Sequence, residues 1–346
     1  MILLVFRQEK ARENKALRGF YQVLFLAVIL TGISCFFHIS VAYPETIRSR
    51  SAIVVDASTG KTLYAKNPDL RLPPASTVKL MTAIVAIENA QLTDIATVSK
   101  RAVRVSPCKA GFKAGDKVTI ETLLYAALVK SGNDAAAVLA EAVAGTEKEF
   151  VRLMNRKALA IGATNTKFKN PHGLPAAGQY TTASDLSKIM THALTYPMLR
   201  DIIGTRVVEV LTENGHALFL KNTNKLLWSE DDLVGGKTGY TRRARHCFVG
   251  AAERGDSKVI VAVLGSPNRK TLWKESEKLI QEGFEVMTNG KDSLKFSKKS
   301  QGDLKKVSYK KNIKFQARTS KTDKERDIVE KKAERDRKPK IERKCI

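Results

Sequence analysis

Cysteine is scarce in this chain of 346 residues, and its spacing excludes two kinds of site. The four cysteines lie far from one another and share no motif; they are Cys35, Cys108, Cys247 and Cys345. Metal sites and disulfide frameworks both need cysteines at characteristic spacings. The sequence therefore predicts neither, and we assign the cysteines no role.

Acidic side chains are also few: 35 Asp and Glu stand against 60 Lys and Arg, which gives a formal net charge of +25. Residues 291–346 hold 21 of the basic and 9 of the acidic residues, and so carry about half of the excess. Low hydrophobicity with dense charge is typical of disorder or of a loose helical extension. We expect a solvated basic tail, which an anionic membrane surface or cell-wall polymer would attract.

Charge is absent altogether from Gly19 to Pro44. Five basic residues precede this gap, the apolar run VLFLAVILTGISCFF lies inside it, and the small residues Ser40–Ala42 follow the run. This order is typical of a secretory signal, but the gap is also long enough to span a membrane. Residues 1–42 are therefore predicted to be a signal peptide or an N-terminal membrane anchor. In both cases the rest of the chain is exported, to the periplasm or the outer face of the cytoplasmic membrane, which argues against nucleic acid as a partner.

Hydrophobic patterns predict one mixed α/β domain. The stretch AIVVDASTGKTLYAK, residues 52–66, predicts two short strands around a turn. Helices are predicted from Ser76 onward and at 121–130, 134–143, 147–160, 182–196 and 271–285, and further strands at 206–211, 234–240, 246–254 and 258–264. Because strands lie at both ends with helices between them, we expect the N- and C-terminal strands to share a sheet.

A lysine interrupts the most apolar of these helices. In RLPPASTVKLMTAIVAIENA, residues 71–90, the side chains from Val78 to Ile87 are apolar on almost every face, and such a helix is buried. Lys79 would lose hydration there, which lowers the pKa of an ammonium group and lets the amine act as a base. Ser76 lies three residues earlier on the same face, so the two form a candidate nucleophile and base. Alone the pair is weak evidence, because S-x-x-K is common and a lysine can extend out of a core helix.

Two further triplets follow. Ser131-Gly132-Asn133 separates the helices predicted at 121–130 and 134–143, a break so tight that we expect its side chains to be exposed. Lys237-Thr238-Gly239 lies in a predicted strand with glycines on both sides, and the missing side-chain bulk would let a ligand backbone lie along the strand. Lys237 and Thr238 could then hold a carboxylate. Each triplet also has an ordinary structural explanation, as a helix cap or a strand end.

The order of the three triplets is far more specific than any one of them, since it matches the S-x-x-K, S-D-N and K-T-G set of the serine enzymes that penicillin acylates. Longer blocks also match, among them DASTGKTLYAKNPDLRLPPASTVKLMTA, LLYAALVKSGNDAAAVLAE, NPHGLPAAGQYTTASDL, NTNKLL and GGKTGYT. From about residue 50 to 285 the chain resembles the low-molecular-mass penicillin-binding proteins that are D-alanyl-D-alanine carboxypeptidases, peptidase family S11. The resemblance implies, for residues 43–290, the penicillin-recognising serine DD-peptidase and β-lactamase-like fold, an antiparallel sheet flanked by helices with a helical subdomain.

The resemblance also implies a reaction. The enzyme would remove the terminal D-alanine from peptidoglycan stem pentapeptides, and β-lactams would inhibit it by trapping the nucleophile. The implied catalytic residues are Ser76 as nucleophile, Lys79 as base and Ser131 as proton relay. The implied substrate-binding residues are Asn133, Lys237, Thr238, Gly239 and Tyr240, with the backbone N–H groups of Ser76 and Tyr240 as oxyanion hole. No metal or cofactor is implied.

The sequence departs from the family pattern at two places. Where the family usually has Ala-Gly shortly after K-T-G, this chain has Ala244-Arg245, within the basic stretch RRARH. Where the family often has an arginine for the substrate carboxylate, this chain has Leu272, and Arg269 or Lys270 could replace it. Recognition of the terminal carboxylate is therefore open.

Several alternatives stay open at this stage. A DD-endopeptidase that cuts cross-links would use the same residues, and a catalytically inactive peptidoglycan-binding protein could keep the fold. A β-lactamase is disfavoured, because no E-x-x-L-N segment for rapid deacylation occurs between Asn133 and Lys237. His172 could be taken for a catalytic base, but a role in organising its loop is the better interpretation, because Lys79 already supplies a base.

Overall fold

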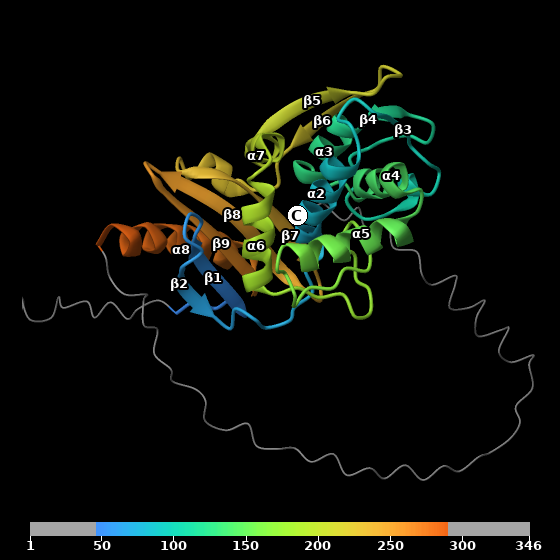
Figure 1. Cartoon of the computed structure of the whole chain (residues 1–346). Coiled ribbons are helices and arrows are strands. Elements are labelled where there is room, and N and C mark those ends of the chain that lie inside the picture. Colours follow the sequence, from blue (N-terminus) through green and yellow to red (C-terminus); the bar gives the residue numbers. More distant parts are fainter. Residues whose placement is uncertain (1–45, 290–346) are drawn as a thin grey trace, which may run out of the picture. The chain divides into compact units, whose positions relative to one another are not determined.

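A five-stranded antiparallel sheet organises the part of the chain that the computed structural model describes, residues 46–289. Its strand order is β2-β1-β9-β8-β7, with β1 at Ser51–Asp56, β2 at Thr62–Lys66, β7 at Leu233–Thr241, β8 at Arg245–Arg254 and β9 at Ser257–Ser266. β1 pairs with β9, so the N- and C-terminal strands share one sheet, as predicted (Figure 1). Within residues 46–289, β7 pairs only with β8 and so forms one edge of the sheet.

Helices cover both faces of this sheet. β1 is buried at all six of its positions, and because successive side chains of a strand point to opposite faces, both faces must be covered there. Helix α8, Arg269–Asn289, packs on β1, β8 and β9, and helix α6, Ala183–Ala193, packs on the same three strands. This burial explains why the strands at both ends of the domain are continuous apolar runs.

A helical region adjoins the sheet and is built around α2, Lys79–Asn89. The surrounding helices are α3 at Ile120–Leu128, α4 at Asn133–Ala144 and α5 at Glu147–Ala160, all of which pack on α2 (Figure 1). The first turns of α3, α5 and α6 are capped by threonine side chains that accept backbone N–H groups. The predicted mixed α/β class and its helical subdomain are thus confirmed.

Several small elements were not predicted. They are the hairpin of β3, Ile95–Thr97, with β4, Lys117–Thr119; strand β6, Ala217–Lys221, which pairs with the predicted strand β5, Val207–Leu211; helix α7, Pro197–Gly204; and the 3-10 turns η2, Ala102–Arg104, and η3, Lys225–Trp228. Strands of three residues are too short for a periodic signal. The residues of β6, ALFLK, alternate between exposed and buried, but the first four are all apolar, so the sequence itself has no two-residue period.

The predicted signal or anchor, residues 1–42, and the predicted basic tail, residues 291–346, lie outside the described residues. Among residues 46–289, no helix is both long and apolar enough to cross a bilayer. Arg48 and the described residues after it form one compact unit, and all the elements above belong to that unit.

Candidate active site

Ser76 and Lys79 meet at the start of α2. Ser76 lies in the 3-10 turn η1, Ala75–Val78, and Lys79 is the first residue of α2. The Lys79 Nζ atom lies 2.9 Å from Ser76 Oγ, so the predicted pairing on one helix face is present. Ala75 enters the turn with φ of 50°, and a Cβ at Gly173 would lie 1.8 Å from the Ala75 carbonyl oxygen. A glycine at 173 is therefore required for the loop to pack against the serine turn.

Lys79 is fully buried, and its amine is held by two further acceptors. Its Nζ atom donates to Asn133 Oδ1 at 2.6 Å and to the His172 carbonyl oxygen at 2.9 Å. These contacts replace the water that the amine loses on burial, which is how a lysine can stand in the core. They also fix the position of the nitrogen beside Ser76 Oγ.

The break between α3 and α4 presents Ser131 and Asn133 to this centre. Asn133 Nδ2 donates to the Pro107 carbonyl oxygen at 2.5 Å, which orients the amide so that its oxygen faces Lys79. The Asn133 backbone N–H donates to the Cys108 carbonyl oxygen at 2.7 Å. Ser131 and Asn133 are buried, at 6% and 2% exposure, so the expectation that this break exposes its side chains was wrong. Strand β7 and the chain around Cys108 cover it.

Strand β7 brings the third triplet to the same place. Lys237 is fully buried, and its Nζ atom donates to Ser131 Oγ at 2.9 Å and to the Thr238 carbonyl oxygen at 3.1 Å. Thr238 Oγ1 lies 2.6 Å from Thr223 Oγ1, in the segment after β6. The structure thus joins β7 to the α3–α4 break by one lysine, across 106 residues of sequence.

Gly239 lies against the backbone of the serine turn. A Cβ at this position would be 2.9 Å from the Ser76 backbone nitrogen and 3.0 Å from Ala75 Cβ. The glycine is needed for the close approach of β7 to Ser76. Tyr240 follows at 39% exposure, with its ring 4.4 Å from the His246 ring.

His172 is buried beside the site, and its two ring nitrogens contact Leu174 and Glu147. Its carbonyl oxygen accepts from Lys79, and its ring nitrogen Nδ1 accepts the Leu174 backbone N–H at 3.3 Å. Burial, followed by the charges of Lys79 and Arg101, lowers the pKa of His172 to about 3. A histidine that is so hard to protonate is a poor proton shuttle at neutral pH, which agrees with a role in organising the loop.

The structure shows the surroundings of the two positions that depart from the family pattern. Arg245 has φ of 63°, a left-handed conformation that favours glycine, so the family's glycine fits the backbone here better than arginine does. Leu272 is buried at 2% exposure. Arg269, one helical turn earlier, lines a cavity of about 470 Å³ together with Thr223, the partner of Thr238.

The structure therefore brings together seven of the eight residues predicted for the site, which are Ser76, Lys79, Ser131, Asn133, Lys237, Thr238 and Gly239; the eighth, Tyr240, follows Gly239 on β7 and stacks on His246. Sequence reasoning missed Thr223, although it lies in the matched block NTNKLL. It also missed the backbone carbonyls of Pro107 and His172, which no residue pattern marks.

Comparison with known proteins points to one family. The sequence model of peptidase family S11, described as D-alanyl-D-alanine carboxypeptidase, matches residues 38–268. The chain is 34% identical over 242 residues to the D-alanyl-D-alanine carboxypeptidase DacF of Bacillus subtilis, and 36% identical over 251 residues to DacC of Escherichia coli. These matches cover 68% and 69% of this chain and 62% of each relative, so the chain spans less than two thirds of those two proteins.

Solved structures agree with the sequence relatives. The Streptomyces K15 DD-transpeptidase superposes with a TM-score of 0.67 at 32% identity, over 70% of this chain and 100% of that one. The curated D-alanyl-D-alanine carboxypeptidase of Streptomyces sp. K15 is 34% identical, over 69% of this chain and 88% of the relative. The family match, these identities and the fold lead to one conclusion: the chain belongs to peptidase family S11, the D-alanyl-D-alanine carboxypeptidases.

Proposed function

We propose that this protein is a serine-type D-Ala-D-Ala carboxypeptidase that removes the terminal D-alanine of peptidoglycan stem peptides through an acyl-enzyme on Ser76. The observation that carries the proposal is the buried amine of Lys79, 2.9 Å from Ser76 Oγ and held by Asn133 and the His172 carbonyl. We further propose residues 43–290 as the catalytic domain, with residues 1–42 as export signal or anchor.

Acylation follows from the contacts of Lys79. A neutral amine has two N–H groups and one lone pair; Asn133 Oδ1 and the His172 carbonyl oxygen accept the two N–H groups. The lone pair then faces Ser76 Oγ and takes its proton as the oxygen attacks the carbonyl carbon of the penultimate D-alanine. The positive charge of Lys237 nearby favours the neutral form of this amine.

The tetrahedral intermediate needs donors for its oxyanion, and we propose the backbone N–H groups of Ser76 and Tyr240. The approach of Gly239 to the Ser76 nitrogen supports this pairing, because Tyr240 is the next residue of β7. Two backbone donors on a packed turn and a sheet strand are held rigidly, so little reorganisation is needed as the negative charge develops.

The departing D-alanine needs a proton and a place for its carboxylate. Ser131 Oγ accepts a hydrogen bond from the Lys237 ammonium, so it is free to donate its own proton to the leaving amine and to recover one from Lys79. Lys237 and Thr238 bind the terminal carboxylate in this scheme. Leu272 stands where the family often has an arginine for this carboxylate. Arg269, which lines the same cavity as Thr223, supplies the positive charge instead.

The peptide lies antiparallel to β7, whose outer edge is unpaired within residues 46–289. Its C-terminus is then at Lys237 and Thr238, and its upstream residues run toward Thr241. Asn133, whose Oδ1 contacts Lys79, positions the substrate peptide once its Nδ2 exchanges the contact with the Pro107 carbonyl oxygen for one with the peptide. Water finally cleaves the ester and releases the shortened stem peptide, whereas a β-lactam in the same position leaves Ser76 acylated.

The first test is intact-mass spectrometry of the full chain with a penicillin, and separately with a peptide that ends in D-Ala-D-Ala. We expect one penicilloyl adduct per molecule and release of one D-alanine, and neither in Ser76→Ala. Ser131→Ala keeps the nucleophile, so its adduct should form more slowly but still form. No adduct and no release in the wild type would refute the proposal and favour an inactive peptidoglycan-binding protein.

A second candidate is a DD-endopeptidase, because a D-alanyl-D-alanine endopeptidase of Pseudomonas aeruginosa is 32% identical over 239 residues. The acyl-enzyme would be the same, and only the leaving amine would differ. A cross-linked dimeric peptide tests it: release of the two halves at a rate above that of D-alanine release would make the endopeptidase the main activity.

We also propose an extracytoplasmic location, because peptidoglycan is the substrate of this scheme. The basic tail, residues 291–346, would bind an anionic membrane surface or cell-wall polymer. Sedimentation with anionic and with neutral vesicles tests the tail in two chains that both begin at residue 43, so that the N-terminal apolar run does not contribute, and that end at residue 346 or at residue 290. Only the chain that ends at residue 346 should sediment, and only with anionic vesicles.

A further inference from the structure

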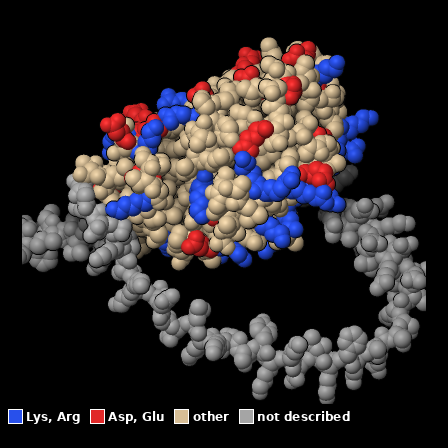
Figure 2. All heavy atoms as spheres, viewed as in Figure 1, with Lys and Arg blue, Asp and Glu red and all other residues tan. Residues whose placement is uncertain are grey.

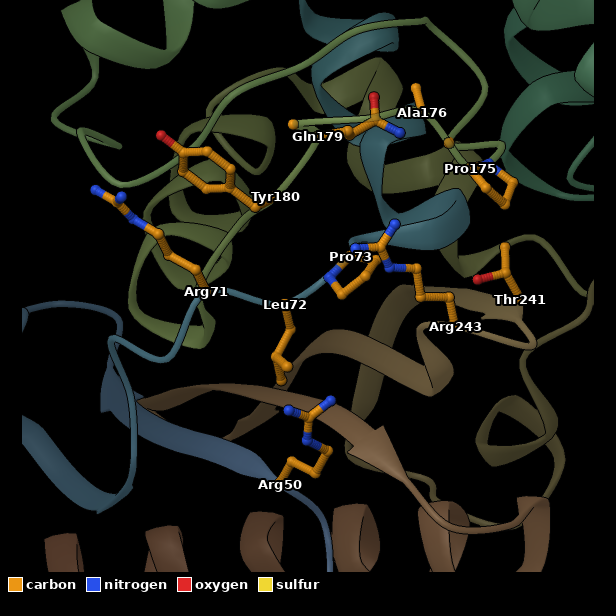
Figure 3. A pocket seen from close by; sticks show the side chains of 12 residues that line it. Arg50, Arg71, Leu72, Pro73, Pro175, Ala176, Gln179, Tyr180, Thr241 and Arg243 are labelled. Carbon is orange, nitrogen blue, oxygen red and sulfur yellow. The ribbon is translucent and has the colours of Figure 1, made fainter. Parts of the chain in front are cut away.

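A cavity of about 410 Å³ lies beside the serine turn and is lined by three arginines (Figure 3). Arg50 precedes β1, Arg71 precedes the double proline before Ser76, and Arg243 lies in the turn between β7 and β8. The rest of the lining comes from Leu72, Pro73, Gly173, Pro175, Ala176, Gly178, Gln179, Tyr180 and Thr241. The cavity therefore carries three positive charges and no acidic side chain.

These arginines are not neutralised by neighbours. Among the ion pairs of residues 46–289, none involves Arg50, Arg71 or Arg243. Arg71 is nevertheless held in place, because its guanidinium donates to Asn165 Oδ1 at 2.7 Å and lies 4.6 Å from the centre of the Tyr180 ring. Lys and Arg side chains also gather on the lower part of the face in Figure 2. Such a site attracts an anion with two or more oxygens.

The cavity adjoins the proposed nucleophile on two sides. Gly173, in its lining, packs so closely on Ala75 that an added Cβ would lie 3.0 Å from the Ser76 backbone nitrogen. Thr241 follows Gly239 by two residues on β7, and Gly239 packs on the same nitrogen. The cavity therefore lies next to Ser76, on the side of Thr241.

The distance along β7 shows which part of a substrate reaches this cavity. Adjacent residues of an extended chain are about 3.3 Å apart, so Thr241 lies roughly 10 Å beyond Thr238. An antiparallel peptide with its C-terminal carboxylate at Thr238 then has its penultimate residue between Gly239 and Tyr240, where its carbonyl oxygen meets the Tyr240 N–H. The two residues before D-Ala-D-Ala lie at Thr241 and just beyond it, where a side chain a few ångströms long reaches the arginines.

We propose that the cavity of Arg50, Arg71 and Arg243 is an anion subsite for a carboxylate on one of the two residues that precede D-Ala-D-Ala in the substrate. This inference rests on the proposed function, because it assumes that the peptide lies along β7 with its C-terminus at Lys237 and Thr238. The subsite makes the enzyme selective for acidic stem peptides over their amidated forms. All three arginines are exposed, so water weakens each ion pair, and we expect a preference of about fivefold to tenfold.

The experiment compares acidic and amidated peptides of equal size at pH 7. Two pairs of N-acetylated tetrapeptides end in D-Ala-D-Ala and carry Glu or Gln either directly before it or one residue earlier. The readout is the ratio of kcat/KM for the Glu peptide to that for the Gln peptide, which is independent of how much enzyme is folded. The variants are Arg243→Gln and Arg50→Gln, and Arg242→Gln is the matched control, because Arg242 is adjacent and exposed but does not line the cavity.

We expect the wild type to prefer the Glu peptide by about fivefold or more in at least one pair. The ratio should fall toward one in Arg243→Gln and Arg50→Gln and persist in Arg242→Gln. A ratio near one in the wild type, or an equal fall in all three variants, would overturn the subsite, since the effect would then be absent or only a general charge effect.

A binding measurement separates this inference from the proposed function. In Ser76→Ala, calorimetric titration with the same peptides reports affinity without turnover. Tighter binding of the Glu peptide there, with no D-alanine release by the wild type, would support the subsite while refuting the carboxypeptidase. Equal affinities for the Glu and Gln peptides, with normal D-alanine release by the wild type, would refute the subsite and support the carboxypeptidase.

Discussion

Replacing Gly239 by alanine tests whether the close contact between β7 and the serine turn maintains the reactive geometry. The added Cβ would lie 2.9 Å from the Ser76 nitrogen and 3.0 Å from Ala75 Cβ, whereas ordinary contacts begin at 3.4 Å. The strand and the turn must therefore separate by about 0.5 Å. Neither the serine turn nor β7 can move freely, because Ser76 is held by the start of α2 and β7 is held by its pairing with β8.

The size of the effect follows from this displacement. A 1 Å misplacement of reacting groups can cost roughly 100-fold in rate, so half of it should cost about tenfold. Overpacking should also reduce the free energy of unfolding by about 1 to 3 kcal/mol, which for a domain of this size lowers Tm by roughly 2 to 12 °C. We therefore expect Gly239→Ala to fold and to be acylated about ten times more slowly than the wild type.

The assay is the second-order rate constant of acylation by a fluorescent penicillin, with thermal unfolding measured in parallel. The matched control is Gly283→Ala in α8. Its added Cβ would also lie 2.9 Å from a neighbour, but that neighbour is the Val54 side chain and not the serine turn. It should change Tm without slowing acylation. Acylation of Gly239→Ala at the wild-type rate, or an equal slowing in both variants, would refute the reasoning.

Three other outcomes are expected. Arg245→Gly should raise Tm by roughly 2 to 4 °C, because it relieves a φ of 63° that costs about 1 kcal/mol; an unchanged or lower Tm in a thermal melt would contradict this. Thr223→Val removes the hydroxyl 2.6 Å from Thr238 Oγ1 and should lower kcat/KM for peptide hydrolysis about threefold to tenfold, whereas the exposed Thr195→Val should not. His172 stays neutral in the fold, with a pKa of about 3, while the unfolded chain binds a proton near pH 6.5, so its contribution to stability is complete above pH 6.5 and is lost as pH falls toward 3. The free energy of unfolding, measured in urea at several pH values over that range, should rise with pH less steeply in His172→Gln, by up to about 1.4 kcal/mol per pH unit. Equal slopes in the variant and the wild type would contradict the argument.

Much of the site was accessible from the sequence, because its strongest signals are local. Ser76 and Lys79 share a helix face whatever the rest of the fold does, since positions three apart on a helix are neighbours. The apolar run around Lys79 likewise required a buried amine, and the apolar strands at both ends of the domain required a covered sheet. Family S11 was recognisable from the order of the triplets together with the longer matching blocks around them.

Only the tertiary structure decided how the local pieces meet. Asn133 lies 54 residues from Lys79, and the carbonyl of His172 lies 93 residues away, so no periodicity links them. The same holds for Gly239, whose place against Ser76 depends on the path of β7. The cavity of Arg50, Arg71 and Arg243 joins the start of β1, the segment before the serine turn and the β7–β8 turn. Sequence patterns encode neighbours along an element, whereas such sites arise from contacts between elements that the folded chain path alone brings together.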